Sequence, residues 1–133
     1  MEESESGFSD INHAFELADD LLSQAPENAA CNIVYFSGCT PAAGDYDEEG
    51  VYTMEDCAYR VTSTGIYLYA HSNAVYETTK ALSDKGYKIY TLGCVTNLEE
   101  QPEMYNFFIK VMKDMANSGY YDAANPEDLE AVF

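Results

Sequence analysis

The chain has 133 residues, enough for one domain with a single hydrophobic core. Its 24 acidic residues against 6 lysines and arginines give a formal net charge of −18, and all six basic residues lie between Arg60 and Lys113. Such a surface repels phosphate backbones and anionic lipid, so it argues against nucleic-acid binding and against attachment to a membrane surface. No stretch is apolar for long enough to span a bilayer, so membrane insertion is not expected.

The N-terminal part predicts a flexible start followed by an amphipathic helix. Residues 1–7 are acidic and serine-rich, and they are too acidic for a secretory signal peptide. Ser9 is a suitable N-cap, and the apolar residues that follow it repeat at helical spacing until Pro26. We therefore expect one helix here, with one face in the core.

The next two segments differ sharply in character. "NIVYFS", Asn32–Ser37, is a short run of β-branched and aromatic residues without polar alternation, which is typical of a strand covered on both faces. Residues 40–70 are predicted to form a long irregular loop. It opens with the acidic stretch "AAGDYDEEG", and its second half shows no clean period.

A second helix and a second strand follow this loop. Apolar residues at helical spacing predict a helix over Asn73–Lys85, and Gly86 is a suitable residue to end it. "YKIYTLGC" then has the composition of another buried strand.

The last third repeats the same order of elements. Pro102 suits the first turn of a helix whose Met and Phe stripe belongs in the core, and Gly119 is expected to end it. "YYDAA" predicts a third strand, and Asn125 is the N-cap of a final helix. This alternation of helices and strands predicts an α/β fold with a parallel sheet and helices on both of its faces.

The residues that could support catalysis are few and scattered. The four cysteines, Cys31, Cys39, Cys57 and Cys94, form no C-x-x-C pair, and free thiols are the default expectation. Cys39 follows a strand, but its acidic surroundings would raise the pKa of a thiol. His13 and His71 form no recognisable triad order with a serine or a cysteine. "SGCTPAAG" is also too poor in glycine to cradle a phosphate. A small enzyme that uses a thiol or a carboxylate remains the alternative to a binding protein.

Four stretches together resemble the C-terminal half of a von Willebrand factor type A (vWA) domain. They are "GFSDINHAFELADDLL", "NIVYFSGCTP", "ALSDKGYKIYTLGC" and "SGYYDAANPEDLEAVF". The resemblance covers essentially Ser6–Phe133 and implies a partial vWA-like domain over residues 8–133. Its expected fold is a three-layer α/β/α, Rossmann-like arrangement, truncated to about three parallel strands with flanking helices.

The resemblance also implies a metal-ion-dependent adhesion site that has degenerated. The family holds Mg²⁺ with an Asp-x-Ser-x-Ser motif after its first strand, a threonine in the next loop and an aspartate at a later strand end. Here the first motif is missing, Ser9 stands at the threonine position, and Gly38 stands at the aspartate position. A hard cation needs several oxygen ligands, so Ser9 is only a remnant ligand. No cofactor is expected, unless a partner completes the site for Mg²⁺ or another divalent cation.

The missing half makes the strand at residues 32–37 a predicted interface. In the family this strand lies beside the first strand, so its loss leaves an unpaired apolar edge, which proteins normally cover. The predicted interface residues are Ile33, Val34, Tyr35 and Phe36. Three covers are possible: a second copy that forms a homodimer, a separate complementing chain, or residues 40–70 folded back. We favour the homodimer.

The expected function is therefore a non-catalytic protein-interaction or adhesion-type module. The resemblance favours an extracellular or cell-surface location. Five tyrosines in the long loop are predicted either to form a binding surface or to cover the open edge: Tyr46, Tyr52, Tyr59, Tyr67 and Tyr69. A truncated gene product without a function of its own is a further alternative.

Overall fold

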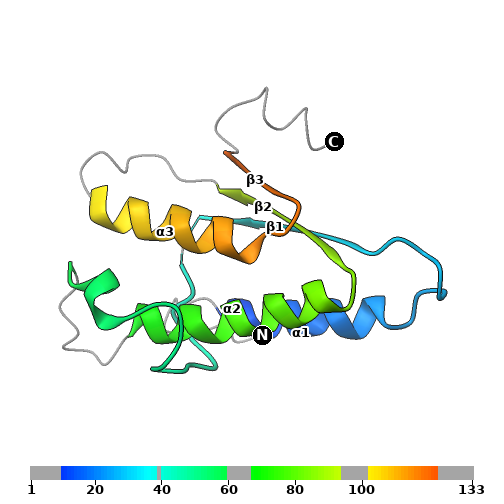
Figure 1. Ribbon diagram of the computed structural model, residues 1–133, viewed down its shortest axis with the longest axis horizontal. Coiled ribbons are helices and arrows are strands. Elements are labelled where there is room, and N and C mark those ends of the chain that lie inside the picture. The colour runs from blue at the N-terminus through cyan, green and yellow to red at the C-terminus, as the bar shows by residue number, and fades with distance from the viewer. Residues whose placement is uncertain (1–9, 39, 60–66, 94–101, 123–133) are drawn as a thin grey trace, which may run out of the picture.

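A computed structural model describes residues 10–38, 40–59, 67–93 and 102–122. The regular elements follow one another as α1 (Ile11–Leu22), β1 (Asn32–Ser37), η1 (Met54–Cys57), α2 (Leu68–Asp84), β2 (Lys88–Gly93), α3 (Pro102–Met115) and β3 (Gly119–Asp122). The strands form a parallel sheet in the order β1-β2-β3, and helices flank it (Figure 1). The predicted α/β class with three parallel strands is confirmed. Within the described residues, no helix is long and apolar enough to cross a membrane.

The ends of the helices depart from the expected positions in three places. The cap of α1 is Asp10 instead of Ser9, because its carboxylate accepts a hydrogen bond of 3.1 Å from the His13 amide. α2 begins at Leu68, well before the predicted Asn73, since the buried residues at its start extend the apolar face. α3 ends at Met115, before Gly119, which instead opens β3.

Other predicted boundaries agree with the structure. Gly86 follows α2 with a φ of 94°, a conformation that favours glycine and ends the helix. Pro102 is the first residue of α3, as expected. Residues 1–7 and the helix predicted after Asn125 lie outside the described residues.

One face of the sheet carries the described helical layer. The register pairs Tyr35 of β1 with Thr91 of β2, so both side chains lie on the same face. The Tyr35 ring lies 5.3 Å from the Phe15 ring of α1, and the Thr91 hydroxyl donates a 2.8 Å hydrogen bond to the Met112 carbonyl of α3. α1 and α3 therefore cover the same face. α2 packs between these two helices, and Figure 1 shows it beside α1.

The prediction that β1 is covered on both faces is wrong, because the side chains on its other face are exposed. Ile33 is buried, whereas Val34 is 44% exposed and Phe36 is 57% exposed. The strand was expected to be covered on both faces, but its exposure alternates with the side-chain period of two. Its apolar composition therefore does not reflect burial on both sides.

The irregular segment between β1 and α2 is fixed by one buried side chain. Asn73, in α2, donates hydrogen bonds of 2.9 Å to the Asp47 carbonyl and 3.0 Å to the Tyr52 carbonyl. Its amide oxygen accepts a 2.8 Å hydrogen bond from the Tyr52 amide. These bonds satisfy backbone groups of Asp47 and Tyr52 without a neighbouring strand.

Candidate functional site

The β1 edge is the strongest candidate for a functional surface. β2 pairs with β1 along its whole length, from Asn32 opposite Lys88 to Ser37 opposite Gly93. The described strands leave the other side of β1 without a neighbouring strand. The prediction that residues 32–37 form a sheet edge is therefore supported, with Val34 and Phe36 as its exposed apolar side chains.

Helix α1 extends this apolar surface beside the strand. A groove of about 190 Å³ lies between the two elements and is lined by Ala14, Phe15, Ala18, Ile33, Val34 and Tyr35. On α1, Leu17 is 50% exposed and Leu21 is 71% exposed. Leu17, Leu21, Val34 and Phe36, with the groove between α1 and β1, are called the apolar edge below.

The two leucines of the apolar edge were not recognised from the sequence as surface residues. The residues of α1 that pack into the core include Ile11 and Phe15. Ala14, Leu17 and Leu21 recur at helical spacing outside this buried stripe, so the apolar side of the helix is wider than its buried side. That excess width is the signal that could have identified them. A helix with a single buried stripe would carry polar residues at these positions.

The described residues at the end of β1, where the family resemblance places a metal, offer few ligands for a cation. Gly38 has no side chain to offer, and Ser9 lies outside the described residues. Asp45, an exposed carboxylate in the loop after β1, already accepts a 2.8 Å hydrogen bond from the side-chain amide of the buried Asn12. A cation bound between these two side chains would need the amide oxygen of Asn12 as a ligand. Asn12 instead points its NH₂ group at Asp45. The described residues contain no group of three histidine, cysteine, aspartate or glutamate side chains able to hold a metal ion.

The acidic loop around this position is packed against both helices. Gly44 has a φ of 86°, and a Cβ at this position would collide with the carboxylate of Asp10. The next residues are tied to α2, since the amide of Asp47 donates a 2.9 Å hydrogen bond to the Ala70 carbonyl. Asp47 also accepts a 3.0 Å hydrogen bond from the Glu49 amide, and both side chains are exposed. The loop therefore has a defined path and a solvated acidic surface.

The five predicted binding tyrosines separate into core and surface residues. Tyr52 and Tyr69 are buried, Tyr59 and Tyr67 are partly buried, and Tyr46 is exposed. The Tyr52 ring packs edge-to-face on Phe107 at 5.6 Å, away from β1. A contact surface made of all five rings is thus contradicted by the burial of Tyr52 and Tyr69. Tyr52 covers the helices and does not cover the open edge.

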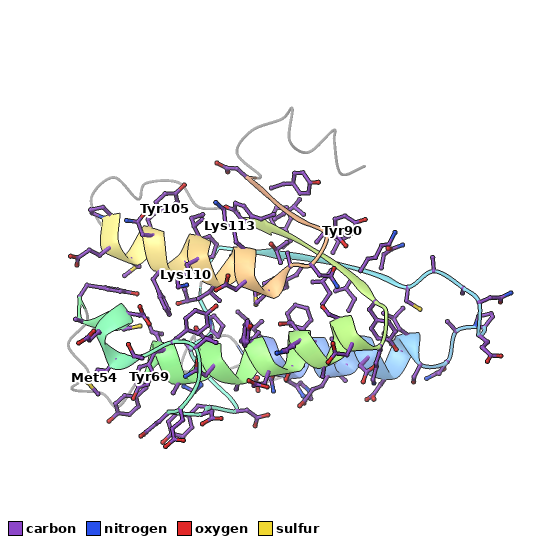
Figure 2. All side chains as sticks on the ribbon, viewed as in Figure 1. Met54, Tyr69, Tyr90, Tyr105, Lys110 and Lys113 are labelled. Carbon is purple, nitrogen blue, oxygen red and sulfur yellow. The ribbon has the colours of Figure 1, made fainter. Side chains whose placement is uncertain are left out.

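Tyr52 also carries the largest electrostatic perturbation in the described residues. Its hydroxyl donates a 2.7 Å hydrogen bond to the Asp114 carboxylate. Burial, together with this carboxylate, raises the pKa of Tyr52 far above its ordinary value. The Lys110 ammonium lies 5.5 Å from the centre of the Tyr52 ring and 3.6 Å from Asp114. The phenol is a neutral, structural donor that ties the loop to α3, which carries Lys110 and Lys113 in Figure 2.

The candidate catalytic residues within the described part of the chain are not brought together. His13 is exposed and lies 3.9 Å from Glu16 on the same helix. The His71 ring contacts Tyr46, and its Nδ1 lies 3.1 Å from the Asp45 carbonyl. Cys31 and Cys57 are free thiols, and Cys39 and Cys94 lie outside the described residues. Neither histidine makes a hydrogen bond to a cysteine or a serine in the part of the chain that is described.

A second pocket lies at the other end of the strands. It has a volume of about 280 Å³ and is bordered by the end of α1, by Cys31 and by Lys85 to Lys88. Lys85 is engaged there with Asp19 at 2.7 Å. Ligands of open α/β sheets bind at the carboxyl ends of the strands, which is the opposite end. We therefore do not assign a function to this pocket.

Comparisons of the chain with protein-family models, curated proteins and solved structures found no match.

Proposed function

We propose that this chain is a non-catalytic protein-interaction module that binds its partner through the apolar edge. The observation that carries the proposal is the exposure of Val34 and Phe36 on an edge strand. Leu17 and Leu21 are also exposed, on the helix that shares a groove with this strand. A strand edge offers backbone donors and acceptors, and the neighbouring apolar side chains offer buried area. Edges of this kind are normally covered in soluble proteins.

We further propose that the module is a partial vWA-like domain with a degenerate metal site. This proposal is supported by the order β1-β2-β3, with a helix before each strand, and by Gly38 at the end of β1. In this interpretation the first strand of the family fold would lie beside β1, along the apolar edge. Adhesion outside the cell and a divalent cation completed by a partner are further expectations of the same resemblance.

The proposal is tested with a peptide that imitates an added strand. A fluorescent peptide of residues 32–37, with two lysines at each end for solubility, is titrated with the protein and followed by anisotropy. We expect saturable binding, because the alternating apolar side chains of the peptide match the exposed ones of β1. A scrambled peptide with the same lysines controls for attraction to the acidic surface.

Matched variants locate the binding surface. V34K/F36K places two charges on the apolar edge and is expected to weaken peptide binding by about tenfold or more. V51K/M54K makes the same chemical change at two similarly exposed residues, which are 51% and 59% exposed. Met54 lies far from Tyr90 and the sheet in Figure 2, so this control should bind normally. Equal binding by all three proteins, or no binding by any, contradicts the proposal.

A further inference from the structure

We infer that the partner at the apolar edge is a second copy of this chain, paired antiparallel through β1 with Tyr35 on the two-fold axis. This inference rests on the proposed function and specifies its partner. It would join two three-stranded sheets into one sheet of six strands. A two-fold axis is the commonest symmetry of homo-oligomers.

The alternation of side chains along β1 restricts the possible registers. A two-fold axis perpendicular to the sheet keeps each face continuous, so only residues of the same face can stand opposite each other. Two registers then centre the pairing on the strand. One places Val34 opposite itself and Phe36 opposite Asn32, and the other places Tyr35 opposite itself and Phe36 opposite Val34 of the second copy.

The second register is the one that buries the exposed residues. It forms two cross-strand pairs of Phe36 with Val34, and pairs of an aromatic with a β-branched residue stabilise antiparallel strands. Both residues are exposed in the single chain, and both lie on the face that lacks the described helices. The first register would instead place each Phe36 opposite the polar, exposed Asn32.

The general charge of the chain opposes self-association, but the sequence around β1 is free of this repulsion. Two chains of net charge −18 repel each other over most of their surfaces. Between Glu27 and Asp45 the sequence contains no charged residue and no histidine, and β1 lies inside this neutral stretch. The β1 strand is thus a place where two copies can meet without opposing like charges.

Helix α1 makes the contact continuous beyond the strand. It lies along the same edge as β1, as the shared groove shows. The two-fold axis would place both copies of α1 on the same side of the joined sheet. Leu17 and Leu21, which are exposed on this helix in the single chain, would then be available to contact the helix of the second copy.

The described part of the long loop does not compete for this surface. Its central residue, Tyr52, contacts Tyr76 of α2 and Phe107 of α3. Its backbone is held by Asn73. The alternative in which this loop folds back over β1 is therefore not supported for residues 40–59.

Sedimentation velocity on three proteins tests the pairing and its register. The wild-type chain is expected to be a dimer at tens of micromolar. V34E/F36K should also dimerise, since the predicted register places the new glutamate of one copy opposite the new lysine of the other. V34K/F36K should be at least about tenfold weaker, because like charges then stand opposite each other. The two added lysines of V34K/F36K lower the net negative charge of the chain and so reduce the general repulsion between copies. A weaker dimer of this variant must therefore come from the like charges at the interface.

Each outcome decides a different point. A monomeric wild-type chain that still binds the strand peptide overturns the homodimer and leaves the proposed function intact. Weak association of V34E/F36K, equal to that of V34K/F36K, overturns the register with Tyr35 on the axis. A wild-type dimer unaffected by either double variant shows that the copies meet elsewhere and overturns the inference. Circular dichroism confirms that each variant is folded, which is expected because both positions are exposed.

Discussion

At the scale of single residues, Tyr52 shows how a loop residue can become part of the core. Its ring is wholly buried against Phe107, and its hydroxyl reaches Asp114 on α3. A tyrosine suits this place because a buried ring that ends in a hydroxyl needs a hydrogen-bond partner only at its tip. The residue therefore fixes the position of the loop between β1 and α2.

Two substitutions at Tyr52 should separate packing from hydrogen bonding. Tyr52→Phe removes one hydrogen bond to a partly exposed carboxylate and should reduce the free energy of unfolding by about 0.5–1.5 kcal/mol. Tyr52→Ala should reduce it by about 3–5 kcal/mol because a buried ring is lost. Urea denaturation at neutral pH measures both values. Tyr46→Ala is the control at an exposed ring, and a similar loss there would show that burial is not the cause.

At the scale of elements, an ion pair connects α1 to the turn between α2 and β2. Asp19 accepts hydrogen bonds of 2.7 Å and 2.9 Å from the Lys85 ammonium, and one of 3.1 Å from the Tyr87 hydroxyl. The hydrogen bond from Lys85 lowers the pKa of Asp19, partial burial opposes this effect, and Tyr87 adds to it. The contact connects segments far apart in sequence and was not foreseen.

The stabilising effect of Asp19 should depend on pH in a defined direction. A carboxylate whose pKa is lower in the folded state stabilises the fold above its unfolded pKa, about 3.9, and the effect is lost as the pH falls through the folded pKa. Asp19→Asn should therefore cost no more than about 1 kcal/mol at pH 7, since the pair is partly exposed. The difference from wild type should be smaller at about pH 3 than at pH 7, because the effect begins to be lost below the unfolded pKa. Urea denaturation at the two pH values measures it, and an equal difference at both would contradict the assignment.

At the scale of the whole molecule, the high negative charge and the neutral apolar edge have opposite effects on association. Repulsion acts between charges spread over the surface, whereas the attraction at β1 comes from apolar pairs and backbone hydrogen bonds. Salt screens the charge repulsion over a Debye length of about 8 Å at physiological ionic strength. It leaves the apolar pairs and backbone hydrogen bonds at β1 largely unchanged.

Self-association should therefore strengthen as salt is added. Raising the sodium chloride concentration from about 0.02 M to about 0.5 M is expected to lower the dimer dissociation constant severalfold. Sedimentation equilibrium at the two concentrations measures this change, and V34K/F36K is the matched control. Weaker association at high salt would instead indicate an interface held by charge pairs.

Much of the fold could be read from the sequence because its signals are local. The strand at Asn32–Ser37, the helix that starts at Pro102 and the stop at Gly86 all follow from composition and spacing within a few residues. The edge position of β1 was also expected, but only through the family resemblance. The start of α2 at Leu68 was missed, since its first turn is identified by burial against other elements.

The sequence by itself determined the order of the elements, the parallel α/β class and the acidic surface, because periodicity and charge depend on neighbouring residues alone. The tertiary structure decided which apolar residues are exposed. Val34 and Ile33 differ little in chemistry, yet only the arrangement of the helices over one face of the sheet leaves the first exposed and buries the second. The same long-range packing placed Tyr52 in the core and Leu21 at the surface. The apolar edge is thus a product of tertiary packing acting on residues that all appear, in sequence, to belong inside.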